Sequence, residues 1–470
     1  MKIEQIYTGC LAEAAYYIES NGEAVVIDPL RETAPYIDRA TKDGAKIKYV
    51  LETHFHADFV SGHLDLAKKT GATIVFGPTA VPNFEAHVAT DGEILKVGNV
   101  QIKVLHTPGH TMESSSFLLF DEKGKEVAVF TGDTLFIGDV GRPDLAVKSD
   151  VSREDLAGML FDSLRHKIMP LPNHLTVYPG HGAGSACGKK MAKETQSTIG
   201  MQKELNYALR ADMTRDEFVK AVTDGLVDPP QYFPKNAVIN KMGYDSIDNV
   251  LNRGVHALDV RAFVTVAETE NALLIDARSE HDFVKGFIPG SVFIGLNGQF
   301  ASWVGTLVTD LKQPILLITE PGKEEEAVLR LARVGYDNTI GYLKGGFDAW
   351  KTAGKDVDTI ESIDIEAFAA KGKLPQWRIL DVRRKSEYDS EHVVGAQNFP
   401  LDFINKNMAE ISRDQNYLVY CAGGYRSAIA ISILKSRGFD HLVNVLGGFT
   451  AIKVAGLLPI SELVAQSTEL

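Results

Sequence analysis

Histidine and aspartate side chains recur directly after four apolar segments in the N-terminal half of the chain. Residues 53–58 read THFHAD, residues 107–110 read TPGH, residues 131–134 read TGDT and residues 178–181 read YPGH. The candidate side chains are His54, His56, Asp58, His110, Asp133 and His181. Imidazole and carboxylate groups together suit a first-row metal ion. Four such segments therefore predict a metal site.

The segments that must position these side chains read as buried strands. Apolar, β-type runs precede all four motifs, at residues 47–51, 100–105, 127–130 and 175–178. Loops at the ends of strands commonly carry binding and catalytic groups, because the rigid strands hold them in place. We therefore expect four strand ends to converge on one point.

Composition and charge exclude several classes of protein. The chain has 470 residues and a net charge of −13, so we expect about two to four domains and no nucleic-acid partner. No apolar run approaches the ~18–20 residues that span a bilayer, and the N-terminal residues show no signal-peptide pattern. Three cysteines in so long a chain do not form a disulfide framework. These features predict a cytoplasmic protein without a membrane partner.

The C-terminal part of the chain is an internal duplication. Residues 274–278 (LIDAR) recur as residues 379–383 (ILDVR), and residues 343–347 (LKGGF) recur as residues 446–449 (LGGF). Each copy alternates strand-like and helical segments, which is typical of an α/β domain with a parallel sheet. The predicted domains are residues 1–250, 251–355 and 356–470.

The order and spacing of the four metal-type segments resemble the metallo-β-lactamase superfamily. The resemblance covers roughly residues 1–250 and implies a four-layer αβ/βα sandwich with the site at one edge of its two sheets. Two-metal members, such as glyoxalase II, carry a further histidine directly after HxHxD. That position is Phe59 here, and a phenyl ring cannot bind a metal. This departure indicates a site for one metal ion.

Among members of the superfamily, the iron-dependent persulfide dioxygenases use one metal held by two histidines and one carboxylate. Carried across, the implied ligands are His54, His110 and Asp133. They would hold one Fe(II) per chain, with zinc as the alternative, and leave positions open for substrate and O₂. His56, Asp58 and His181 then orient the ligands or metal-bound water. Direct ligation by His56 and His181 stays open.

Two further residues are candidates for binding substrate. Residues 141–144 (GRPD) resemble the GRTD segment of persulfide dioxygenases, which implies that Arg142 contacts a carboxylate of the thiol carrier. A structural arginine in a turn is the alternative. Cys187 lies among small residues and precedes Lys189 and Lys190, which would favour its thiolate. Its alternatives are a thiol that handles persulfide and a buried, inert cysteine.

The second copy of the duplication contains a nucleophile motif. Residues 418–427 read LVYCAGGYRS, which places Cys421 after a strand and before a glycine-bearing loop and a helix. Backbone N–H groups in such a loop stabilise an anion. The motif resembles the rhodanese family, which implies that Cys421 carries sulfane sulfur, Arg426 adds positive charge, and Gly423 and Gly424 contact the sulfur. The loop is one residue shorter than that of a Cys-x₅-Arg phosphatase, which favours sulfur transfer.

The first copy cannot perform this chemistry. The matching place reads ITEPGK at residues 318–323, and no cysteine occurs between residues 188 and 420. Glu324 and its two acidic neighbours would also repel an anion at the start of the following helix. We interpret this copy as an inactive, rhodanese-like spacer or docking domain.

Together the motifs resemble a bacterial fusion of persulfide dioxygenase with tandem rhodanese domains. The resemblance implies oxidation of a low-molecular-weight thiol persulfide by O₂ to sulfite and thiol, as in sulfide detoxification. Glutathione persulfide is the default substrate, and coenzyme A, bacillithiol and inorganic polysulfide stay open as the sulfur carrier. Cys421 would convert sulfite to thiosulfate or run the reverse transfer, and related proteins suggest a homo-oligomer (dimer or tetramer). The alternatives are a zinc-dependent, glyoxalase II-like thioester hydrolase and a non-enzymatic sulfur-trafficking or scaffolding protein.

Overall fold

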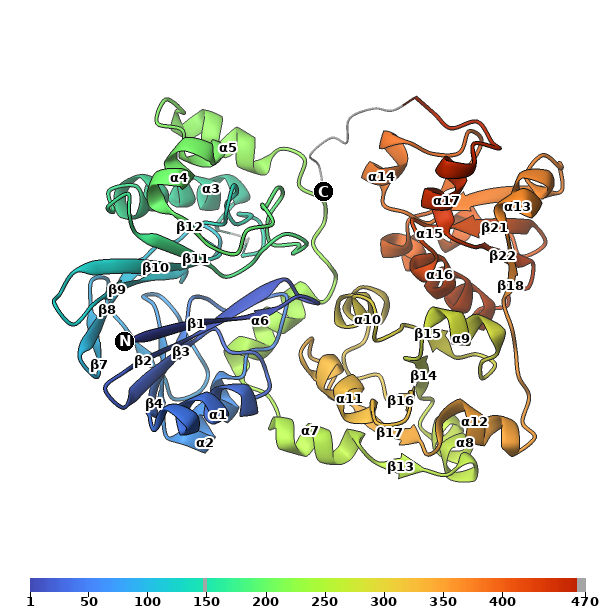
Figure 1. The fold of residues 1–470 in the computed structure, drawn as a ribbon, viewed down its shortest axis with the longest axis horizontal. Coiled ribbons are helices and arrows are strands. Elements are labelled where there is room, and N and C mark those ends of the chain that lie inside the picture. The colour runs from blue at the N-terminus through green and yellow to red at the C-terminus, as the bar shows by residue number, and fades with distance from the viewer. Residues whose placement is uncertain (147–149, 463–470) are drawn as a thin grey trace. The chain divides into compact units, whose positions relative to one another are not determined.

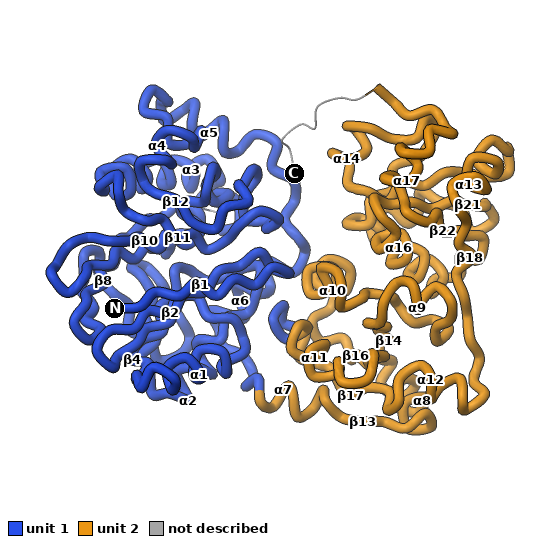
Figure 2. The backbone as a smooth tube through the Cα atoms, viewed as in Figure 1, with its two compact units in different colours: residues 1–247, 332–335, 468–470 blue, residues 248–331, 336–467 orange. Residues whose placement is uncertain are grey.

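The computed structural model describes residues 1–146 and 150–462. These residues form two compact units (Figure 2). One unit contains residues 1–247 and 332–335, and the other contains the remaining described residues. The division at residue 247 lies close to the predicted limit at residue 250, and the predicted limit at residue 355 lies inside the second unit. The three domain ranges themselves stay predictions.

Two mixed sheets of six strands form the centre of the first unit (Figure 1). The first sheet has the strand order β1-β2-β3-β4-β5-β6. Its strands are β1 (Lys2–Thr8), β2 (Glu13–Ser20), β3 (Glu23–Ile27), β4 (Lys46–Glu52), β5 (Thr73–Phe76) and β6 (His87–Val88). The second sheet has the order β12-β11-β10-β9-β8-β7. Its strands are β7 (Ile94–Val97), β8 (Val100–His106), β9 (Ser115–Phe120), β10 (Glu126–Gly132), β11 (Thr176–Pro179) and β12 (Ser197–Thr198).

Strand β2 explains why helices and a second sheet cover the two faces of the first sheet. Successive side chains of a strand point to opposite faces, and nearly every residue of β2 is buried. Tyr16 joins the core between the two sheets, which includes Phe117 of β9. Its neighbour Tyr17 packs instead with Tyr36 of α1. A strand that is apolar on both faces therefore requires a covering layer on each side.

Helices form the two outer layers of the first unit. They are α1 (Ala34–Asp43), α2 (His63–Thr70), α3 (Arg153–Ser163), α4 (Ile199–Leu205), α5 (Arg215–Thr223) and α6 (Phe233–Met242), and α7 (Ile247–Gly254) follows at the unit boundary. Leu66 of α2 packs on the first sheet, whereas Leu160 of α3 and Phe218 of α5 join the core on the second sheet. The predicted four-layer αβ/βα sandwich is confirmed.

The second unit contains two five-stranded sheets in which every pair of strands is parallel. The strand orders are β13-β17-β16-β14-β15 and β18-β22-β21-β19-β20. The same order of first, fifth, fourth, second and third strand occurs in both sheets, so the duplication seen in the sequence is a duplication of topology. The prediction of two α/β domains with parallel sheets is confirmed.

The elements of the two copies correspond along the chain. The first copy contains β13 (Ala257–Leu258), α8 (Val260–Thr269), β14 (Leu273–Asp276), α9 (Glu280–Lys285), β15 (Val292–Phe293), α10 (Phe300–Leu307), β16 (Ile315–Ile318), α11 (Glu324–Ala332), β17 (Thr339–Leu343) and α12 (Gly346–Thr352). The second contains β18 (Glu361–Ile363), α13 (Ile365–Lys371), β19 (Trp377–Asp381), α14 (Lys385–Ser390), β20 (Gln397–Asn398), α15 (Ile404–Asn407), β21 (Asn416–Tyr420), α16 (Tyr425–Ser436), β22 (Leu442–Val445) and α17 (Gly448–Ala455). Within the described ranges, no helix has the length and apolar character needed to cross a membrane.

Candidate metal centre and sulfur-transfer loop

Three side chains from both sheets meet at one edge of the sandwich. His54 follows β4 of the first sheet, whereas His110 and Asp133 follow β8 and β10 of the second. The Nε2 atoms of His110 and His54 lie 3.4 Å and 3.9 Å from Asp133 Oδ2. One possible ligand atom from each residue lies within 4.8 Å of the others, and all three side chains are buried. The structure therefore brings the three implied metal ligands together.

The donor set of this cluster fits a divalent metal ion. Asp133 Oδ2 is buried and has no hydrogen-bond partner among the described residues. A buried carboxylate oxygen without a partner is costly, and a bound cation would remove that cost. Burial alone would raise the pKa of Asp133, but His181, His110 and His54 hold it well below its usual value. The carboxylate is therefore the charged form that a metal requires.

Hydrogen bonds on the far side of each imidazole fix its orientation. His110 Nδ1 donates to the carbonyl oxygen of Arg142 at 2.9 Å, so its Nε2 is free to accept a metal. His54 Nδ1 lies 2.9 Å from Thr53 Oγ1. That hydroxyl donates to Asp28 Oδ2 at 2.8 Å, so it accepts from His54. Both histidines are thus held in the tautomer that binds a metal through Nε2.

Thr53→Val tests whether the Thr53 hydroxyl orients the His54 imidazole, because valine keeps the shape of threonine and removes the hydroxyl. We expect metal affinity to fall about 10- to 100-fold, the usual cost of losing a partner of a metal-binding histidine. Titration against a competing chelator measures the affinity. Thr223→Val removes a buried hydroxyl of α5 that bonds to the Val219 carbonyl at 2.7 Å, and it should leave metal affinity unchanged. An equal effect of both variants would contradict the orientation.

Two glycines allow the site loops to approach Asp133 closely. A Cβ atom at Gly141 would lie 2.0 Å from the Asp133 carbonyl oxygen and 2.9 Å from His110 Nδ1. A Cβ atom at Gly180 would lie 2.6 Å from Asp133 Oδ1. Only glycine fits at such distances. The glycines of the GRPD and YPGH segments are therefore part of the construction of the site.

A second buried group, formed by Asp58, His181 and Cys187, adjoins the cluster. His181 lies between two carboxylates, with Nε2 2.7 Å from Asp58 Oδ2 and Nδ1 2.8 Å from Asp133 Oδ1. Burial alone would lower the pKa of His181, but Asp133 and Asp58 raise it well above its usual value. His181 therefore holds Asp133 through its Oδ1 atom, and its role beside a metal stays a prediction.

The surroundings of Cys187 differ from those expected from its neighbouring lysines. Lys189 Nζ bonds to the carbonyl oxygens of Ala221 and Asp224. The Cys187 side chain is buried near carboxylates, and burial together with Asp58 and Asp133 raises its pKa well above the usual value. The thiol form is therefore favoured, because tertiary contacts hold Lys189 elsewhere.

Arg142 is buried and its guanidinium has protein partners. It forms a bidentate pair with Asp144, with N–O distances of 2.6 Å and 2.7 Å. It also donates to the carbonyl oxygens of Ala186 and Val227 at 3.3 Å and 2.6 Å. These contacts fix the loop whose carbonyl orients His110. Contact with a substrate carboxylate stays a prediction and would require Arg142 to exchange one of these partners.

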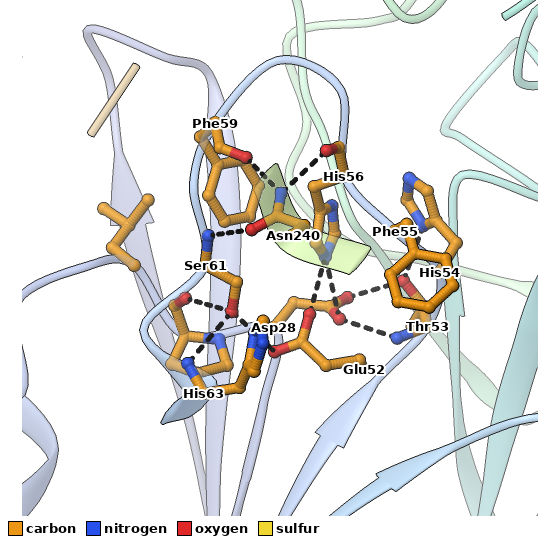
Figure 3. Close-up of polar contacts among 12 residues, drawn as sticks. Asp28, Glu52, Thr53, His54, Phe55, His56, Phe59, Ser61, His63 and Asn240 are labelled. Atoms are coloured by element: carbon orange, nitrogen blue, oxygen red, sulfur yellow. Dashed lines mark hydrogen bonds and ion pairs between the residues drawn. The ribbon is translucent and has the colours of Figure 1, made fainter. Parts of the chain in front are cut away.

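His56 lies beside the cluster, but its ring is directed to Asp28 and Glu52 (Figure 3). Its Nε2 is 3.0 Å from Asp28 Oδ1 and 3.4 Å from Glu52 Oε2. Its ring packs against Phe59, with 4.3 Å between the centroids. Glu52 was not identified from the sequence. The available signal was a carboxylate at the last position of an apolar strand, directly before the THFHAD motif.

The Cys421 loop of the second copy forms a compact anion-binding turn. Cys421 follows β21, and its side chain is buried. The backbone N–H of Gly424 donates to Cys421 Sγ at 3.1 Å, and Ser427 Oγ lies 3.7 Å from the same sulfur. Helix α16 begins directly after Gly424. A sulfur anion at this position faces a backbone donor and a helix N-terminus.

Arg426 is held by a carboxylate that was not identified from the sequence. Its Nη1 and Nη2 atoms donate to Glu387 of α14 at 2.6 Å and 2.8 Å. Beside this pair lies a cavity of about 560 Å³. Its lining residues are Arg383, Glu387, Ser390, Glu391, Phe449, Thr450, Lys453 and Val454. The ion pair fixes the guanidinium at the end of the loop and next to space for a small molecule.

Glu387→Gln tests whether the pair positions Arg426 for sulfur transfer. We expect kcat/KM for transfer from thiosulfate to fall roughly tenfold, the equivalent of ~1.4 kcal/mol, because the charge-assisted bonds of the pair weaken. Asp389→Asn removes an exposed pair with Lys385 in the same domain and should retain wild-type transfer. Unchanged kcat/KM in Glu387→Gln would show that Arg426 does not need this partner.

The first copy keeps the framework of the second without its nucleophile. Arg278 pairs with Asp276 as Arg383 pairs with Asp381, with Nη2–Oδ2 distances of 2.6 Å and 2.5 Å. The turn before α11 contains no cysteine, and the first turn of α11 contains three glutamates. The fold is retained in the first copy, whereas a persulfide cannot form there.

Comparison with known proteins agrees with this division of the chain. The family model of the metallo-beta-lactamase superfamily matches residues 8–181. A probable hydroxyacylglutathione hydrolase of Schizosaccharomyces pombe is 30% identical over 263 residues, which cover 51% of this chain and 96% of that protein. The chain belongs to the metallo-β-lactamase superfamily. The model of the rhodanese-like domain matches residues 259–353 and 365–455, so two rhodanese-like domains follow the metallo-β-lactamase domain, as predicted.

Relatives within the superfamily include enzymes of two kinds. Human mitochondrial persulfide dioxygenase ETHE1 is 30% identical over 211 residues, covering 44% of this chain and 74% of that protein. The crystal structure of a metallo-beta-lactamase from Staphylococcus aureus has a TM-score of 0.63 and 32% identity, covering 73% of this chain and 98% of that chain. The persulfide dioxygenase and the hydrolase are equally similar in sequence. The metallo-β-lactamase domain is thus homologous to both kinds of enzyme, and it binds metal in a fold shared by hydrolases and dioxygenases.

Proposed function

We propose that the metallo-β-lactamase domain oxidises a low-molecular-weight thiol persulfide to sulfite and that the second rhodanese domain transfers sulfane sulfur. The observation that carries the first part is the three-residue cluster of His54, His110 and Asp133, with Phe59 where two-metal relatives have a ligand. In balanced form, R–S–SH, O₂ and H₂O give R–SH, sulfite and two protons. Glutathione persulfide is the first substrate to test.

His54, His110 and Asp133 would hold the metal in this reaction. A ferrous ion bound there would supply a redox-active centre with free coordination positions for oxygen chemistry. Thr53 and the Arg142 carbonyl hold the two imidazoles. The burial of all three ligand side chains limits the access of bulk water to the site, which favours the intended reaction over side reactions.

Cys187 and Arg142 are proposed to contact the substrate. Cys187 belongs to the same buried group as Asp58 and His181, and a neutral thiol there can lie against a persulfide sulfur without charge repulsion. Arg142 would receive a carboxylate of the carrier if its pair with Asp144 opened.

Cys421 is proposed to accept sulfane sulfur and pass it on. The thiolate attacks the outer sulfur of a persulfide donor, and the carrier thiolate leaves. Sulfite then attacks the outer sulfur of the Cys421 persulfide, which forms thiosulfate and regenerates the thiolate. The loop of Gly423 and Gly424 would face the transferred sulfur, and the Gly424 N–H already donates to Sγ. The sulfite produced by the first domain is thus the sulfur acceptor for the third domain.

A zinc-dependent thioester hydrolase is the second candidate for the first domain. The observation in its favour is the 30% identity to a probable hydroxyacylglutathione hydrolase, which equals the identity to the persulfide dioxygenase. Zinc-bound hydroxide would be the nucleophile of that reaction. The loss of a ligand position at Phe59 is the observation against it.

Parallel assays of iron-loaded and zinc-loaded protein separate the two candidates. Each form is given glutathione persulfide with an oxygen electrode and, separately, a glutathione thioester with a thiol-reactive dye. We expect iron-dependent O₂ uptake with sulfite as product and only background hydrolysis of the thioester. Rapid hydrolysis by the zinc form without O₂ uptake by the iron form would establish the hydrolase instead.

A further inference from the structure

His56 adjoins one member of the candidate metal cluster but does not join the cluster. Its ring centroid is 4.2 Å from that of His54. Its ligand atom groups instead with those of Asp28 and Glu52, all within 4.8 Å of one another and all buried. Figure 3 shows the imidazole directed to these two carboxylates. His56 is only two residues from His54 in the sequence, but its side chain is directed away from the three proposed ligands.

The carboxylates of Asp28 and Glu52 make different hydrogen bonds. Asp28 accepts the backbone N–H of Thr53 at 2.7 Å and its hydroxyl at 2.8 Å, so it fixes the loop that carries His54. Glu52 Oε1 accepts from Ser61 Oγ at 2.6 Å, which leaves Oε2 directed to His56 at 3.4 Å. Glu52 is therefore the carboxylate whose interaction with His56 can be removed without releasing the Thr53 loop.

Burial makes the attraction of Glu52 for the imidazole strong. Glu52 and His56 are each 1% exposed. A buried carboxylate requires a hydrogen-bonded or cationic partner, and charges attract more strongly away from water. The backbone of His56 is fixed independently, because Asn240 Nδ2 donates to its carbonyl oxygen at 2.8 Å. With the backbone held, the direction of the His56 ring depends on the groups that contact the side chain.

We propose that Glu52, together with the nearer Asp28, determines the number of protein ligands at the metal by drawing the His56 ring away from it. The inference rests on the proposed three-ligand site and deepens it. Three ligands on one face suit Fe(II) with open positions, whereas an added nitrogen gives the four-ligand set that zinc prefers. Glu52 is in this sense a positioning residue that selects the metal and, through it, the class of reaction.

Glu52→Gln in the full-length protein is the direct test, with Co(II) as a spectroscopic probe. Glutamine keeps the shape of the side chain and removes one of the two charges that attract His56, while Asp28 keeps the other. Co(II) with fewer than six ligands absorbs visible light much more strongly than six-coordinate Co(II). We expect a weak band in the wild-type protein and a strong band in Glu52→Gln. We also expect zinc to compete with iron roughly tenfold better in the variant, at the low end of effects of residues behind metal ligands.

Two further variants assign the change to His56. The double variant Glu52→Gln with His56→Phe should return to the weak wild-type band, because the added ligand is gone. Glu113→Gln is the matched control. Glu113 accepts the backbone N–H of Phe55 at 3.1 Å, so it contacts the same segment without contacting His56, and its spectrum should equal that of the wild type.

The inference is overturned if Glu52→Gln has the wild-type spectrum and metal preference, or if the strong band persists in the double variant. If Glu52→Gln does not fold, Glu52→Asp takes its place, because the shorter side chain draws the carboxylate back from His56, and it should also give the strong band. His56→Phe is measured beside it. It should retain the wild-type Co(II) band, and a changed band would show that His56 is already a ligand. These readouts need no persulfide, so a failure of the proposed dioxygenase reaction is recognised separately by the O₂ electrode.

Discussion

Replacing His110 with alanine abolishes persulfide-dependent O₂ uptake and leaves sulfur transfer by the rhodanese domain intact. His110 Nε2 lies 3.4 Å from Asp133 Oδ2 in the cluster, and its loss leaves two of the three proposed ligands. A catalytic metal supplies several kcal/mol of transition-state stabilisation, so we expect a fall of about 10³-fold or more in the rate of O₂ uptake. An oxygen electrode measures the first activity, and thiosulfate-dependent sulfur transfer to cyanide measures the second.

His106→Ala is the matched control for this experiment. His106 is the last residue of β8, and its Nε2 contacts the Met112 carbonyl oxygen at 3.0 Å rather than the cluster. It should retain metal and O₂ uptake. Loss of both activities in a folded His110→Ala protein would contradict the proposed division of labour between the domains.

Replacing Cys421 with serine produces the opposite result. Sulfur transfer falls to background, because serine cannot form a persulfide and no other cysteine lies in either rhodanese-like domain. Removal of a catalytic nucleophile costs about 10⁶-fold in a serine protease, and we expect a loss of comparable scale here. Persulfide-dependent O₂ uptake continues, but its product remains sulfite and does not become thiosulfate. Chromatography of sulfite and thiosulfate after a fixed oxygen consumption distinguishes these products.

Cys10→Ser provides the comparison for Cys421→Ser. Cys10 lies outside the metal-ligand groups found among the described residues, so both activities should persist. Thiosulfate formation by Cys421→Ser at the wild-type rate would show that sulfite receives sulfur from another group, with Cys187 as the first residue to examine.

Much of the site could be predicted because local sequence patterns carried it. Apolar strand residues followed by histidine, aspartate and glycine indicated β4, β8, β10 and β11, and the structure has strands at all four places. The repeated LIDAR and GGF segments likewise indicated two domains, since each short motif occupies the same position in its own sheet. Each of these patterns spans only a few consecutive residues. Alternation along a strand and the residue preferences of turns determine local structure over that range, so the sequence alone reveals them.

The partners of these side chains were not predictable in the same way. Glu387 binds Arg426 across 39 positions of sequence, and His181 lies between Asp58 and Asp133, which precede it by 123 and 48 positions. The two lysines after Cys187 suggested a thiolate, but burial near carboxylates raises its pKa. Spacing alone does not reveal which buried groups the fold brings together.

The sequence by itself determined the kinds of group available to this protein: imidazoles and carboxylates in one domain, a thiol in a glycine loop in another, and a phenyl ring in place of a ligand. Only the tertiary structure decided which of those groups form the candidate metal cluster and which pair with other side chains. It directed His56 to Asp28 and Glu52 and left His54 with His110 and Asp133. The physical reason is that a buried charge must find a partner, and the packing of both sheets determines which partner is within reach.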